Sequence, residues 1–146
     1  MSVRIRAALA AAFLLASAGG AQSQSEEASA QQALITRISE RLEPARRAAS
    51  DACGTPLAIA FDPQSLERET APLAQLSACR AAFSALEGYC AGPERPAAVS
   101  ESVTALLCVT GSTRLISLSE GILRFEEKPG ADDPWEFVSQ FLSDAL

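Results

Sequence analysis

Carboxylates are the side chains of this sequence that could carry out catalysis. Asp62 lies between a short apolar run and Pro63, and an acid–base pair of the glycosidase type could be completed by Glu67, Glu69, Glu120 or Glu126. An Asp before a proline also has a structural use, because its side chain accepts a hydrogen bond from the backbone two residues on. We expect Asp62 to be a turn residue, and the acid–base pair is the alternative.

A second acidic group could offer oxygen ligands to calcium. It consists of Asp132 and Asp133 together with Glu126, Glu127 and Glu136. The spacing of an EF-hand is absent, and capping of a helix accounts for Asp133 and Glu136. We therefore expect no metal site here.

Three further features have a structural explanation beside a functional one. The turn 110–113 lacks the length, second glycine and lysine of a phosphate loop, so we expect a hairpin connection. Trp135, Tyr89 and the six phenylalanines could line a ligand pocket, but Trp135 and Phe141 lie on the apolar stripe of a predicted helix, which favours core packing. The arginines at 37, 41, 46 and 47, paired with glutamates at 40 and 43, indicate a solvated helix face.

Histidine is absent from the sequence. The chain therefore lacks the usual general base near neutral pH, the commonest metal ligand and every Ser-His or Cys-His nucleophile pair. We identify no catalytic, cofactor-binding or metal-binding residue and expect no cofactor.

The N-terminus has the pattern of a secretory signal peptide. Arg4 and Arg6 precede an apolar run over 7–16 and then small residues over 17–21. The run is shorter than the roughly 20 residues that cross a bilayer, so we expect cleavage after Ala18 or Ala21. Eleven arginines against one lysine, with abundant alanine, suggest a GC-rich bacterial source, and the destination is then the periplasm or the medium.

Cleavage makes the chain more acidic. It leaves ten basic against 18 acidic residues, so the formal net charge changes from -6 to -8. An acidic surface repels phosphate backbones, so a nucleic-acid partner is not expected. We expect no membrane insertion once the signal peptide is removed.

The remaining chain is predicted to form a mobile leader over 22–30, which has no large apolar residue, and one domain over 31–146. Hydrophobic periodicity and breaker residues predict helix 30–52, strand 57–61, helix 66–91 with its regular part from about 71, strands 103–110, 114–119 and 122–127, and a final helix from 133. Pro44 should kink or divide the first helix. Glu120 and Gly121 should form a tight hairpin turn.

This order of elements predicts an α+β domain of two layers. We expect a small, mostly antiparallel sheet of about four strands, with 103–127 as a three-stranded meander and helices packed on one face. The first strand, which is joined to the meander through a helix, could run parallel to its neighbour.

Four cysteines, Cys53, Cys79, Cys90 and Cys108, occur without a C-x-x-C pair, which favours two structural disulfides in an oxidising compartment. On one continuous helix, Cys79 and Cys90 are about 16 Å apart, which is too far for a bridge. A helix that runs back over strand 57–61 should bring Cys79 to the start of that strand, beside Cys53. We therefore predict the pairs Cys53–Cys79 and Cys90–Cys108.

Two classes of function are consistent with these features. The first is an exported, non-catalytic binding or structural accessory module with an unknown protein or small-molecule partner. The second is a small hydrolase that uses carboxylates alone, which requires Asp62 and one glutamate to converge within about 5 to 10 Å. We favour the first, because most special residues already have a structural role.

Overall fold

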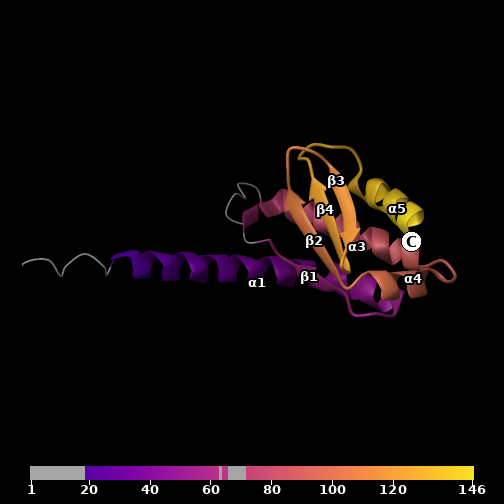
Figure 1. Ribbon diagram of the computed structural model, residues 1–146, viewed down its shortest axis with the longest axis horizontal. Coiled ribbons are helices and arrows are strands. Elements are labelled where there is room, and N and C mark those ends of the chain that lie inside the picture. The colour runs from indigo at the N-terminus through magenta and orange to yellow at the C-terminus, as the bar shows by residue number, and fades with distance from the viewer. Residues whose placement is uncertain (1–18, 63, 66–71) are drawn as a thin grey trace, which may run out of the picture.

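The computed structural model describes residues 19–62, 64–65 and 72–146, so the predicted signal peptide lies almost entirely outside the described residues (Figure 1). The elements, in chain order, are α1 (Gly19–Cys53), β1 (Ala58–Ala60), α3 (Pro72–Cys90), α4 (Arg95–Ser102), β2 (Ala105–Thr110), β3 (Leu115–Ser119), β4 (Ile122–Glu127) and α5 (Pro134–Ala145). None of the described helices is long and apolar enough to span a bilayer.

The four strands form one mixed sheet in the order β1-β2-β4-β3. β1 and β4 run parallel to β2, and β3 runs antiparallel to β4. The α+β class and the parallel first strand are confirmed, but the mostly antiparallel sheet and the meander are wrong. The reason is that the hairpin turn docks at the start of β2, where Thr104 N and Ala105 N donate to the Gly121 carbonyl at 2.7 and 3.2 Å. This contact places β4, rather than β3, beside β2.

The burial of the hairpin strands explains which of them is central. β4 contributes Leu123 and Phe125, both fully buried, whereas β3 alternates between exposed and half-buried residues. Because β4 has a neighbouring strand on each side, its two core-facing side chains are removed completely from water.

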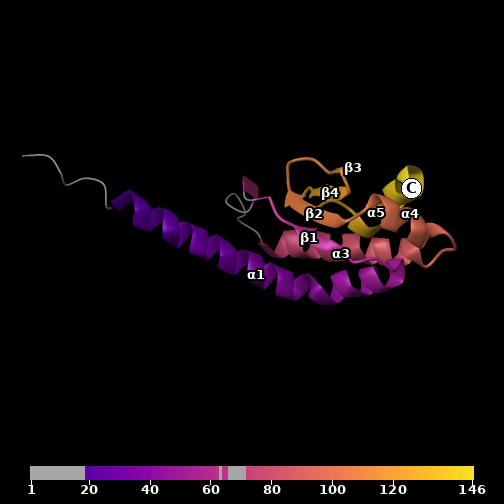
Figure 2. The same cartoon turned by 60° about the horizontal axis from the view of Figure 1, so that its bottom comes forward.

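Helix α3 covers one face of the sheet, and α1 and α5 both pack against α3 (Figure 2). The contribution of α3 and the sheet to the core includes the fully buried side chains of Phe83, Leu86, Leu106, Leu123 and Phe125. On the outer face of the sheet, Leu115 and Ile122 are exposed.

Helix α1 begins earlier than expected and continues as one helix through Pro44. The segment 22–30, predicted as a leader, is helical and exposed along its whole length, and it extends away from the rest of the protein (Figure 1). Burial begins at Ile38, the first residue of the helix in the core, and α1 changes direction in its C-terminal part (Figure 2). Alanine, glutamine and glutamate favour helix without tertiary contacts, which accounts for the extension. That the segment is mobile stays a prediction.

Two local predictions are confirmed and one helix was not expected. Glu120 and Gly121 have φ of 52° and 79°, as a two-residue hairpin requires. Asp133 caps α5, accepting from Trp135 N at 2.9 Å. Helix α4 was not expected between helix 66–91 and strand 103–110, and its Pro96 lies in the first turn, where proline is tolerated.

The disulfides are Cys53–Cys90 and Cys79–Cys108, with Cα atoms 5.0 and 5.7 Å apart. The predicted pairs are therefore wrong, although the exclusion of Cys79–Cys90 is correct. Helix α3 does run back along β1, but its 19 residues span about 28 Å, against about 10 Å for the three-residue strand. The end of α3, not its middle, thus reaches the end of α1, and Cys79 lies level with Cys108 in β2.

Candidate functional site

Asp62 lies where the chain leaves β1, and it has the turn role expected of it. Its Oδ1 accepts a hydrogen bond from Gln64 N at 3.0 Å, and its carbonyl accepts one from Ser65 N at 3.1 Å. The candidate partners Glu67 and Glu69 lie outside the described residues.

The other two candidate partners of Asp62, Glu120 and Glu126, lie at opposite ends of the parallel strands. Because β1, β2 and β4 are parallel, Asp62 at the end of β1 and Glu120 before the start of β4 lie at opposite ends of the strands. Glu126, near the end of β4, lies at the same end of the strands as Asp62. The strands β1 and β4 are two strand spacings apart, about 10 Å, because β2 lies between them.

Glu126 is half-buried and also has structural contacts. Its Oε2 lies 3.8 Å from Nη2 of Arg124, and its carboxylate fills the space that a side chain at Gly111 would occupy. Gly111 N in turn donates to the Glu127 carbonyl at 2.9 Å. The turn 110–113 is therefore not the hairpin connection that we expected, since it joins strands that are not neighbours and passes the end of β4.

The acidic residues near the C-terminus are dispersed over different roles. Asp133 caps α5, Glu127 pairs with an arginine, and Asp132 and Glu136 are exposed. Within the described ranges, no group of three or more cysteine, aspartate or glutamate side chains could hold a metal ion.

A largely buried ion pair that the sequence analysis missed joins the two strands of the hairpin and lies against α5. Arg114 donates from Nε and Nη2 to the two carboxylate oxygens of Glu127 at 3.0 and 3.1 Å, and these side chains are 16% and 12% exposed. The guanidinium lies 5.2 Å from the ring centroid of Phe137, which contacts Phe125. The predicted hairpin turn was the available signal, because it places Arg114 and Glu127 directly opposite each other.

The expectation that the arginines of α1 form a solvated face is wrong for Arg46, whose side chain is only 25% exposed. It donates to both oxygens of Glu43 at 2.7 Å and also to the Leu57 carbonyl at 2.9 Å, so it ties α1 to the entry of β1. The hydrogen bonds from Arg46 are the main cause that lowers the pKa of Glu43 from 4.5 to about 2.

The aromatic side chains divide between core and surface. Trp135 is 43% exposed and lies beside Gly88, so the expectation of core packing is wrong for this residue. Phe141 is half-buried against the core, and Tyr89 is buried with the Arg95 guanidinium 4.9 Å above its ring. The three side chains thus differ in burial, from buried Tyr89 to exposed Trp135.

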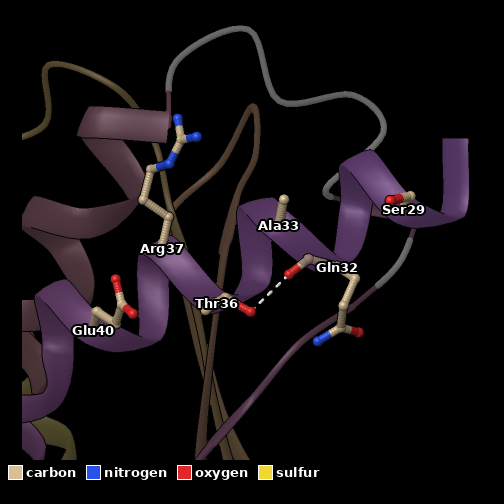
Figure 3. A pocket seen from close by; sticks show the side chains of 6 residues that line it. All are labelled: Ser29, Gln32, Ala33, Thr36, Arg37 and Glu40. Carbon is tan, nitrogen blue, oxygen red and sulfur yellow. Dashed lines mark hydrogen bonds between the residues drawn. The ribbon is translucent and has the colours of Figure 1, made fainter. Parts of the chain in front are cut away.

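The exposed part of α1 carries an open hollow of about 580 Å³ (Figure 3). Its lining comes from one helix and consists of Ser29, Gln32, Ala33, Thr36, Arg37 and Glu40. Thr36 Oγ1 donates to the Gln32 carbonyl at 3.0 Å, a bond within the helix. None of the residues considered for acid–base catalysis lines it.

Among the described residues, Asp62 and Glu126 thus lie at the same end of the parallel strands, and no other candidate carboxylates come together. Comparison with protein-family models, with curated proteins and with solved structures found no match.

Proposed function

We propose that this chain is an exported, non-catalytic binding or structural accessory module of the bacterial periplasm or medium. Two disulfides joining α1 to α3 and α3 to β2 support an oxidising destination. They hold the helical layer to the sheet, so that surface residues are presented from a fixed frame.

The observation that carries the proposal is that Asp62, the centre of the catalytic alternative, and two of the carboxylates considered for calcium are bound to other groups of the fold. Asp62 and Asp133 accept hydrogen bonds from backbone amides, and Glu127 pairs with Arg114. A general acid or base needs a carboxyl group that is available to the substrate. Residues bound in this way serve as turn, cap and cross-strand tie.

A carboxylate-dependent hydrolase is the second candidate. It is favoured by the position of Asp62 and Glu126 at the carboxyl ends of parallel strands. In open sheets of parallel strands, ligands bind at the carboxyl ends of the strands. A separation of about 6.5 to 9.5 Å between the two carboxyl groups corresponds to an inverting glycosidase.

Replacing both carboxylates separates the two candidates. We expect the variant Asp62→Asn/Glu126→Gln to retain the partner that co-purifies with the wild-type protein from the periplasm of the producing bacterium. Glu87→Gln, at an exposed position of α3, is the matched control. Hydrolysis of a glycoside panel by the wild-type protein and the control, but not by the double variant, would contradict the proposal.

A further inference from the structure

Strand β3 is an edge of the sheet without the usual protection against pairing. Its five residues, Leu-Ile-Ser-Leu-Ser, include no charged residue and no proline, and it has no bulge in its register with β4. Natural proteins protect edge strands with lysine, proline, bulges or shortness. The other edge, β1, is only three residues long.

The hairpin geometry determines which backbone groups of β3 point away from the sheet. Ser119 and Ile122 are paired on either side of the two-residue turn, and residues in these positions form a hydrogen-bonded pair. Hydrogen-bonded and non-hydrogen-bonded pairs alternate along an antiparallel ladder. The N–H and C=O groups of Ile116 and Leu118 therefore point outward.

We propose that β3 pairs with β3 of a second copy of this chain, antiparallel, about a two-fold axis at Ser117. In this register, Ile116 lies opposite Leu118 of the second copy. Their outward amides and carbonyls then form four hydrogen bonds across the axis. The two sheets become one sheet of eight strands.

Charge complementarity favours a second copy as the occupant of this edge. The same register places Arg114, just before β3, opposite Glu120 of the second copy, just after its β3. Symmetry repeats this opposite-charge pair at the other end of the strand, and cross-strand pairs of opposite charge stabilise a sheet. Arg114 donates to Glu127 through Nε and Nη2, which leaves Nη1 for the glutamate of the second copy.

The apolar residues of the hairpin fit the same register. On the core face, the row Phe125 and Ile116 continues into Leu118 and Leu123 of the second copy. On the outer face, Leu115 is 57% exposed and Ile122 is 37% exposed. A small serine, Ser119 of the second copy, separates Leu115 from Ile122 of that copy, so these exposed side chains approach each other over it.

Charge substitution at the two-fold axis tests the dimer. We expect sedimentation equilibrium of the oxidised, exported protein to show a dimer that Ser117→Lys or Ser117→Glu alone weakens about fivefold or more, because like charges then face each other. Mixing the two variants should restore dimerisation. Ser117 is exposed, so the monomer should fold, and Ser84→Lys on α3 is the matched control.

Cysteine cross-linking tests the register. In the proposed dimer, the two Ser117 Cα atoms are about 4.5 Å apart, and the two Ser119 Cα atoms are about 13 Å apart. Ser117→Cys should therefore form a covalent dimer, whereas Ser119→Cys on the same strand and face should not. Three results would overturn the proposal: a monomeric wild-type protein, a dimer that neither Ser117→Lys nor Ser117→Glu weakens, or equal cross-linking at the two positions. A monomer whose β3 binds an extended peptide of another protein would also overturn it.

Discussion

The disulfide connectivity can be tested by replacing cysteines in pairs. Sequence separations of 37 and 29 residues across the two bridges imply that each stabilises the folded protein by about 4 kcal/mol in the chain-entropy model. The variant Cys53→Ala/Cys90→Ala, which removes one bridge, should lose about that amount from the free energy of unfolding. Urea unfolding followed by far-ultraviolet circular dichroism measures the loss.

A mismatched pair of substitutions gives a different result. Cys53→Ala/Cys79→Ala leaves Cys90 and Cys108, which lie about 16 Å apart because Cys108 is beside Cys79, and Cys90 is eleven positions further along α3. They cannot pair in the native fold, so both bridges are lost and the expected cost is about 7 kcal/mol. Equal losses in the matched and mismatched variants would refute the connectivity.

Peptide mapping under non-reducing conditions gives a second test. Cleavage after arginine and glutamate separates the four cysteines into peptides 48–67, 70–80, 88–94 and 102–114. The structure predicts that 48–67 is linked to 88–94, and 70–80 to 102–114. A link between 48–67 and 70–80 would show that α3 packs at a different level along α1.

Three further perturbations address the hairpin and α1. Glu127→Gln should lower the free energy of unfolding by about 2 to 3 kcal/mol, measured in urea, because Arg114 loses its charged partner at a nearly buried site. Gly121→Ala should cost about 1 to 2 kcal/mol in the same assay, because φ is +79° and the added Cβ would lie 2.8 Å from the Thr104 hydroxyl. The lowered pKa of Glu43 stabilises the fold in full above pH 4.5, and this contribution is lost as pH falls toward 2, so the difference in urea midpoint between wild type and Glu43→Gln should shrink over that range.

Local features were predictable because they depend on residues close together in the chain. Gly121 after Glu120 identified the hairpin turn, and Asp133 before Pro134 identified the start of α5. In both places a backbone conformation or a cap depends on the residue types themselves. Asp62 was predictable as a turn residue for the same reason.

Features that depend on how elements are placed against one another were not predictable in the same way. The sequence shows that Arg46 lies on a helix, but its bond to the Leu57 carbonyl depends on the path of the chain into β1. Trp135 lies on an apolar stripe, yet its exposure depends on the position of α5 against α3. Periodicity defines the face of an element without stating how far a neighbour covers it.

The amino-acid sequence by itself determined the α+β class, the main helices and strands, the hairpin and the impossibility of a bridge between Cys79 and Cys90, because these follow from local periodicity and the length of one helix. Tertiary structure decided that β4 lies beside β2 and that Cys53 pairs with Cys90. Both depend on non-local registers, namely the docking of Gly121 at the start of β2 and the offset between a long helix and a short strand. Such registers are set by packing over the whole core, which no single segment of the chain encodes.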